Sequence, residues 1–124
     1  MKILLWINMI GEGLVGLLFL FYPGAQELIP GLEEAAGSAA TMLIKMYGTA
    51  ALALALFTGF LLFRPKYCEE VLKDGLALFT FFHAGIAATQ LLYNPDIRPG
   101  VFHAVMTVAF AYFRVKQWQV RPKT

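Results

Sequence analysis

Residues 3–22 of this chain read ILLWINMIGEGLVGLLFLFY, an apolar run that is interrupted by Asn8 and Glu12. About 20 apolar residues in a helix are enough to cross the hydrocarbon core of a bilayer. Three further apolar runs follow, at residues 39–63, 75–93 and 99–118. The pattern predicts an all-α protein in which residues 1–124 form a single integral membrane domain, a bundle of four transmembrane helices.

The composition indicates that lipid, rather than water, surrounds most of the side chains. Hydrophobic residues make up 59% of the chain and charged residues 15%, whereas a soluble domain carries about a quarter charged residues. A chain of 124 residues is also too short to bury so much apolar surface in one core. The net charge of +2 is too small to indicate a nucleic-acid partner, and the single cysteine, Cys68, excludes an internal disulfide bond.

Lysine and arginine residues fall almost entirely on one side of the four predicted spans. That side receives Lys2, Arg64, Lys66, Lys73, Arg114, Lys116, Arg121 and Lys123. The opposite side receives Arg98 alone, and Lys45 lies within the second span. The positive-inside rule therefore predicts a multi-pass protein of the inner membrane with both the N-terminus and the C-terminus in the cytoplasm.

The first span shares a lysine and an apolar core with secretory signal peptides. However, Asn8 and Glu12 interrupt that core, and no pair of small residues typical of a cleavage site follows it closely. We therefore expect this segment to remain in the protein as a membrane span.

Four titratable side chains lie inside the predicted spans, in their outer half or near the midplane. The rise of a helix places Glu12 and His83 roughly 15 Å below the outer interface, and Lys45 and His103 about 9 and 6 Å below it. A charge at the bilayer centre costs about 2.5–3.5 kcal/mol on insertion scales, so such groups are expected to face one another rather than lipid. The sequence thus predicts an outward-facing polar pocket built around these four residues.

The predicted ligand-binding or proton-coupled site is completed by polar neighbours on the same helix faces: Asn8, Gln90 and Thr107. Their alternative role is to join helices by hydrogen bonds. For Glu12 the sequence leaves two states open, an ion pair with Lys45 and a protonated carboxyl group, which burial favours. Lys45 has the further alternative of extending to the outer surface.

A metal centre and a catalytic site have less support in the pattern. Two histidines and a carboxylate are the ligand types of a facial iron triad, but they lie on three helices with no E-x-x-H or H-x-x-x-H pair. The different depths of His83 and His103 disfavour a haem between them. The chain has no Ser/His/Asp arrangement, phosphate-binding glycine loop or C-x-x-C motif. We therefore predict no metal ligand and no catalytic residue.

The order of the polar groups suggests that the bundle consists of two hairpin repeats. The first and third spans run outward and carry Glu12 and His83 near the midplane. The second and fourth spans run inward and carry Lys45 and His103 near their outer ends. A parallel repeat of two hairpins would have this arrangement.

The first span with its proline loop, EGLVGLLFLFYPG, and the second span, KMYGTAALALALFTG, resemble the DoxX-like group of small four-span bacterial membrane proteins. The resemblance covers the whole chain in size and span order. It implies a four-helix bundle and, since some members are linked to quinone-coupled oxidoreductase complexes, a quinone as the candidate cofactor. Glu12 is also similar to the mid-span glutamate of the small multidrug resistance transporters. However, the aromatic motifs of their later spans are missing, and the other three titratable groups are extra.

These observations favour a membrane protein that binds, and carries, a small or amphipathic molecule, with Glu12 as the proton- or charge-coupled group. The expected partners are the lipid bilayer and that ligand, with a homodimer or a partner subunit as further options and no nucleic acid. Three alternatives stay open. They are a membrane subunit of a quinone-linked oxidoreductase complex, a purely structural membrane protein, and a lipid-modifying enzyme with Glu12 and His83 as an acid–base pair.

Overall fold

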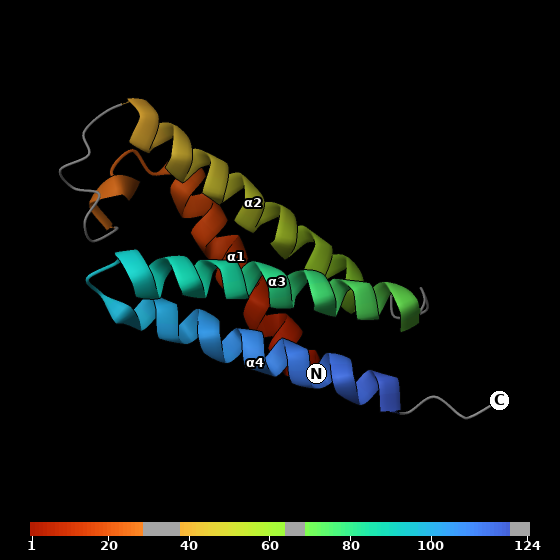
Figure 1. Ribbon diagram of the computed structural model, residues 1–124. Coiled ribbons are helices and arrows are strands. Elements are labelled where there is room, and N and C mark those ends of the chain that lie inside the picture. The colour runs from red at the N-terminus through yellow and green to blue at the C-terminus, as the bar shows by residue number, and fades with distance from the viewer. Residues whose placement is uncertain (29–37, 64–68, 120–124) are drawn as a thin grey trace. The chain divides into compact units, whose positions relative to one another are not determined.

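Figure 1 shows the computed structural model of the chain, which describes residues 1–28, 38–63 and 69–119. Within these residues the regular structure is helical throughout, so the all-α prediction is confirmed. The elements are helix α1 (Lys2–Phe21), the short 3-10 helix η1 (Ala25–Leu28), and helices α2 (Ser38–Phe63), α3 (Glu69–Tyr93) and α4 (Ile97–Gln119).

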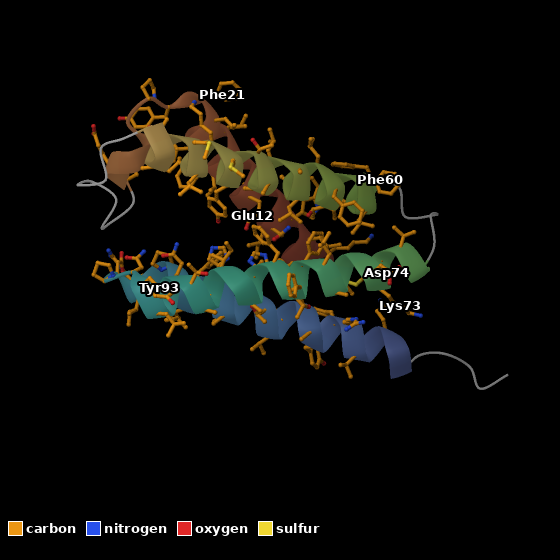
Figure 2. All side chains as sticks on the ribbon, turned by 45° about the horizontal axis from the view of Figure 1, so that its top comes forward. Glu12, Phe21, Phe60, Lys73, Asp74 and Tyr93 are labelled. Carbon is orange, nitrogen blue, oxygen red and sulfur yellow. The ribbon has the colours of Figure 1, made fainter. Side chains whose placement is uncertain are left out.

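Helices α1 and α2 closely follow the first two predicted spans, 3–22 and 39–63. Helix α3 begins at Glu69, whereas the third span was predicted to begin at residue 75. Residues 69–74, EEVLKD, are mostly strong helix formers. Because four of them are charged, they were not recognised as part of an apolar span. The helix therefore extends beyond its apolar segment at the end where Figure 2 shows Lys73 and Asp74.

Helix α4 begins at Ile97, two residues before the predicted start at Pro99, because Asp96 caps it. The Oδ1 atom of Asp96 accepts a hydrogen bond from the backbone N–H of Arg98 at 3.0 Å, and the Arg98 guanidinium also donates to the carboxylate. These hydrogen bonds lower the pKa of the Asp96 carboxyl group. An N-terminal carboxylate satisfies a backbone donor of the first turn, and the proline in that turn loses no helical hydrogen bond.

Three helical segments are long and apolar enough to cross a membrane: Lys2–Phe21, Ala40–Phe63 and Val71–Tyr93. Helix α4 is less apolar, because it contains Arg98, Arg114, Lys116 and two glutamines. The described residues are therefore consistent with a multi-pass membrane protein with three candidate spans. The fourth span of the predicted bundle stays a prediction.

The chain divides into two compact units, one with α1, η1 and α2 and the other with α3 and α4. In the first unit, Trp6 packs edge-on against Phe63, and Phe19 packs against Tyr47, each with 5.6 Å between ring centroids. The start of α1 thus meets the end of α2, so the two helices form an antiparallel hairpin. We call it the first hairpin.

Glycine sets the closeness of the two backbones in the first hairpin. A Cβ atom on Gly16 would lie 2.8 Å from the backbone nitrogen of Leu52 and 2.9 Å from the carbonyl oxygen of Gly48. No side chain fits in this space, which is the geometry by which small residues bring helices together in membranes. The position of α2 along α1 is therefore fixed at this crossing.

Helices α3 and α4 form the second hairpin, also antiparallel. Phe79, in the first half of α3, packs on Phe110 in the second half of α4, with ring centroids 5.1 Å apart. At the other end, a Cβ atom on Gly100 would lie 2.8 Å from Cγ of Leu91. The two hairpins agree with the predicted pair of hairpins, while their relation as a repeat and the single membrane domain stay predictions.

Candidate functional site

The residues of the predicted site divide between the two hairpins. The first hairpin holds Asn8, Glu12 and Lys45, and the second holds His83, Gln90, His103 and Thr107. The meeting of all four titratable groups in one pocket stays a prediction from the sequence.

Asn8 joins α1 to α2 through a partner that the sequence analysis did not identify. Its amide Nδ2 donates a 2.9 Å hydrogen bond to the hydroxyl oxygen of Thr58, and both side chains are buried. The Thr58 hydroxyl in turn donates to the carbonyl oxygen of Leu54 at 2.7 Å. Because the hydroxyl hydrogen is committed to Leu54, its oxygen is left to accept from Asn8. This chain of donors confirms a helix-joining role for Asn8.

Glu12 lies one helical turn beyond Asn8, and its side chain is buried. The adjacent Gly13 faces α2, since a Cβ atom there would lie 3.6 Å from the Cβ of Ala55. The phenol of Tyr47, also on α2, is a further polar group of the first hairpin, and its ring packs against Phe19.

Lys45 has a partner other than Glu12, with which an ion pair was one of the states left open by the sequence. Its Nζ atom donates a 2.8 Å hydrogen bond to the carbonyl oxygen of Leu20, in the last turn of α1. The final carbonyl groups of a helix lack intrahelical donors and carry the negative end of the helix dipole. The ammonium group therefore binds at the end of α1, which agrees with the alternative in which Lys45 extends towards the end of the span.

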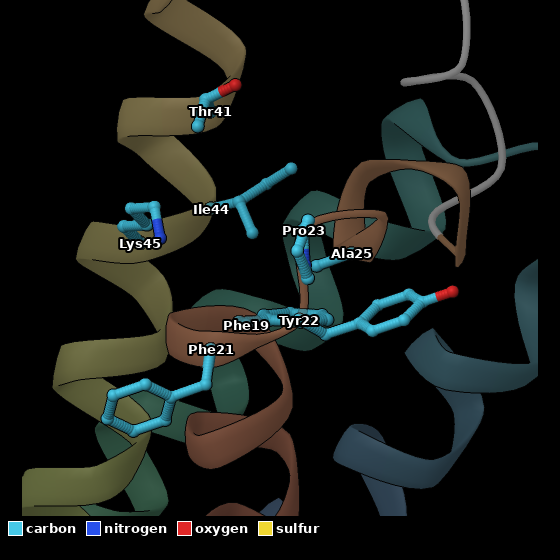
Figure 3. A pocket seen from close by; sticks show the side chains of 8 residues that line it. All are labelled: Phe19, Phe21, Tyr22, Pro23, Ala25, Thr41, Ile44 and Lys45. Atoms are coloured by element: carbon cyan, nitrogen blue, oxygen red, sulfur yellow. The ribbon is translucent and has the colours of Figure 1, made fainter.

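A cavity of about 310 Å³ lies beside this ammonium group, within the first hairpin. Figure 3 shows the residues that line it: Phe19, Phe21 and Tyr22 from the end of α1 and the turn after it, and Thr41, Ile44 and Lys45 from α2. Pro23, in the turn after α1, and Ala25, the first residue of η1, complete the wall. The cavity thus combines one cation with a mainly apolar lining.

In the second hairpin, His83 and His103 contact each other directly. Their Nδ1 atoms lie 2.7 Å apart, a hydrogen-bond distance, and the His83 ring stacks on Phe110 at an interplanar angle of 14°. These two titratable groups were expected to face each other, and their contact agrees with that expectation, although the sequence placed them at different depths. The position of His103 was counted from Pro99, whereas α4 begins at Ile97, so His103 lies further along its helix than the sequence suggested. The two imidazole side chains span the remaining separation between His83 and His103 along the helices.

Gln90 and Thr107 form local hydrogen bonds in the second hairpin. The Gln90 side-chain oxygen accepts from the amide of Asn94, just beyond the end of α3. The Thr107 hydroxyl donates to the backbone carbonyl of His103, one turn earlier in its own helix, at 2.8 Å. Both contacts stabilise helix backbone and turn, and a role of either residue in ligand binding stays a prediction.

Comparison with protein families, curated proteins and solved structures finds no match to this chain. The resemblance to the DoxX-like group, the quinone that it implies and the absence of a metal ligand therefore stay predictions from the sequence.

Proposed function

We propose that this chain is a four-span protein of the inner membrane, with both termini in the cytoplasm. Its proposed function is to bind and carry a small or amphipathic molecule. Glu12 is the proton- or charge-coupled group in this proposal. The three candidate spans support the membrane location.

The exposed face of α4 supports its placement as the fourth span. Large apolar side chains recur along it at intervals of three or four residues and are 48–70% exposed: Val101, Val105, Val108, Tyr112 and Val115. This spacing forms one continuous stripe on a helix. An exposed apolar stripe of this length marks a surface that contacts lipid or another protein.

The observation that carries the proposed function is the carboxyl group of Glu12 inside an apolar helix. Placing an ionisable side chain within a membrane span costs free energy, and such residues usually belong to an ion pathway or a binding site. The Asn8–Thr58 hydrogen bond fixes α1 against α2 one turn away, so the carboxyl group is held at a defined place. A carboxyl group held in this way changes its proton affinity when a charged or polar ligand arrives beside it.

The His83–His103 pair supports a proton-linked function in the second hairpin. A hydrogen bond between two Nδ1 atoms requires one of them to carry a proton and the other to present its lone pair. The pair keeps this bond when it gains one proton, but loses it when both rings are protonated. A pair of this kind can therefore take up and release one proton while the two helices stay joined.

The test of this proposal is ligand retention as a function of pH. The protein is extracted in native-lipid discs, and small molecules enriched over the bulk membrane are identified by mass spectrometry. The variants are Glu12→Gln and, as the control, Glu27→Gln, which changes an exposed carboxylate in η1. We expect a retained molecule whose amount depends on pH in the wild type and in Glu27→Gln, and does not depend on pH in Glu12→Gln.

Two outcomes contradict the proposal. If no molecule is enriched, the purely structural alternative holds. If the pH dependence in Glu12→Gln equals that of the wild type, Glu12 is not the coupled group. Co-purification of a soluble oxidoreductase subunit, with a quinone as the retained molecule, supports the alternative of a quinone-linked complex.

A further inference from the structure

The cavity beside Lys45 has a chemical character of its own. Among its lining residues Lys45 alone carries a charge, and the others contribute aromatic rings, aliphatic groups and a threonine. Among the residues that the structure describes, no carboxylate forms a salt bridge with Lys45. The cavity therefore offers a positive charge that no acidic side chain of the described chain neutralises.

The ammonium group is held in place but keeps binding capacity. A lysine ammonium has three N–H donors, and the contact with the Leu20 carbonyl uses one of them. This contact also fixes the side chain across the end of α1, so little conformational entropy is lost when a ligand binds. Two donors remain for the oxygens of a phosphate or carboxylate, which form the stronger, charge-assisted hydrogen bonds.

The rest of the cavity suits a hydrocarbon chain rather than a polar solute. Phe21 and Tyr22 are large and exposed, and they stand at the end of α1 where aromatic side chains commonly mark the membrane interface. The volume of about 310 Å³ is at the lower end for ligand pockets. It has room for a headgroup and the first part of a chain, while the remainder of the chain would lie in the bilayer.

We propose that the cavity of the first hairpin binds the anionic headgroup of an amphiphile, a phosphate or carboxylate, with Lys45 as its counter-ion and the aromatic side chains around the start of its hydrocarbon chain. This inference rests on the membrane placement and amphiphile binding of the proposed function and names the chemistry of the ligand. It involves the first hairpin alone.

The experiment measures binding of three probes to the full chain in zwitterionic phosphatidylcholine nanodiscs by native mass spectrometry. The probes are dioleoyl phosphatidylglycerol, oleate and inorganic phosphate. The variants are Lys45→Met, the charge-conserving Lys45→Arg, and Lys116→Met as a control at an exposed lysine of α4. Thermal unfolding of each variant shows whether the loss of the α1 contact has changed the fold.

We expect Lys45→Met to weaken phosphatidylglycerol and oleate binding by about tenfold or more, the scale of one lost charge-assisted hydrogen bond. Lys45→Arg and Lys116→Met should bind like the wild type. Phe21→Ala should weaken both amphiphiles and leave phosphate unchanged. Equal binding by Lys45→Met and wild type overturns the inference. Lys45-dependent binding of inorganic phosphate as tight as that of the lipid overturns the amphiphile assignment.

The same preparations separate this inference from the proposed function. If Lys45→Met binds amphiphiles normally while the pH dependence of ligand retention still requires Glu12, only the Lys45 site is wrong. If the Lys45 effect is present while Glu12→Gln leaves the pH dependence unchanged, only the proposed function is wrong.

Discussion

The Nδ1 atoms of His83 and His103 lie 2.7 Å apart, so the two imidazoles are hydrogen-bond partners between α3 and α4. One ring must donate and the other must accept. The stacking of His83 on Phe110 holds its ring in the orientation that this bond needs. The pair is thus both a link between two helices and a place where one proton can be shared.

We expect this bond to break when both imidazoles are protonated, because two N–H donors then face each other. Stability of the second hairpin should therefore fall as the pH drops to the point of double protonation. The measurement is 15N NMR of histidine-labelled protein in bilayers across a pH titration. Asparagine can place an amide near the Nδ1 position, so His103→Asn should keep the His83 bond and His103→Leu should lose it. An identical His83 Nδ1 signal in wild type and His103→Leu would contradict the assignment.

The Asn8–Thr58 hydrogen bond should contribute measurably to the first hairpin. Hydrogen bonds between membrane helices contribute about 0.6 kcal/mol on average and up to about 1.7 kcal/mol. A double-mutant cycle with Asn8→Leu and Thr58→Val, read from unfolding in detergent, should give a coupling energy in this range. Thr49→Val serves as the control, since this hydroxyl donates to the Lys45 carbonyl of its own helix. Coupling between Asn8 and Thr49 as large as that with Thr58 would refute the contact.

The glycine crossing gives a sharper test of helix packing. Gly16→Ala would drive a methyl group against the backbone of α2, and such overpacking costs about 1–3 kcal/mol of unfolding free energy. The same substitution at Gly11, where a Cβ atom would meet nothing within 4 Å, should be neutral or stabilising, because alanine favours helix over glycine. Unfolding titrations of the two variants compare these expectations directly. If Gly16→Ala is as stable as Gly11→Ala, α1 and α2 do not approach as closely as described.

The Asp96 cap should make the stability of the second hairpin depend on pH in the acid range. Arg98 lowers the pKa of Asp96 in the folded state through side-chain and backbone hydrogen bonds. The stabilisation is therefore complete above the pKa of the unfolded chain and is lost as the pH falls through the lowered folded-state pKa. Asparagine is also a good N-cap, so Asp96→Asn should keep the cap and lose this pH dependence. Denaturation of both proteins at neutral and acid pH checks this, and an equal acid-induced loss in Asp96→Asn would count against it.

Much of the helix order could be predicted from the sequence because apolar length and helix-ending residues act locally. Pro23 and Gly24 follow the first apolar run, and α1 ends at Phe21. The start of α3 at Glu69 could not be found in this way, since a charged helix extension looks like a loop in a hydropathy profile. The lower apolarity of α4 has the same origin, in the charges near its two ends.

The contacts of the candidate site were harder to predict, because they depend on how far one helix is shifted along another. The pairing of Asn8 with Thr58 follows from the Gly16–Gly48 crossing, which a hydropathy pattern does not encode. That His83 and His103 face each other was expected, but their direct hydrogen-bond contact depends on how far α4 is shifted along α3. Lys45 does not bind Glu12 but the end of α1, because the carbonyl oxygen of Leu20 lies within hydrogen-bond distance and has no donor within its own helix.

The proposed function depends most on α1–α4 crossing the membrane four times, which places both termini on one side. The test is labelling of single-cysteine proteins with a membrane-impermeant maleimide in intact and in permeabilised spheroplasts. The proteins are the native chain, which contains Cys68, and two variants in a Cys68→Ser background, Thr124→Cys and Asn94→Cys. We expect Asn94→Cys to react in intact spheroplasts, and Cys68 and Thr124→Cys to react only after permeabilisation. Reaction of both Asn94→Cys and Thr124→Cys in intact spheroplasts would place the two ends of α4 on the same side of the membrane and contradict the four-span arrangement.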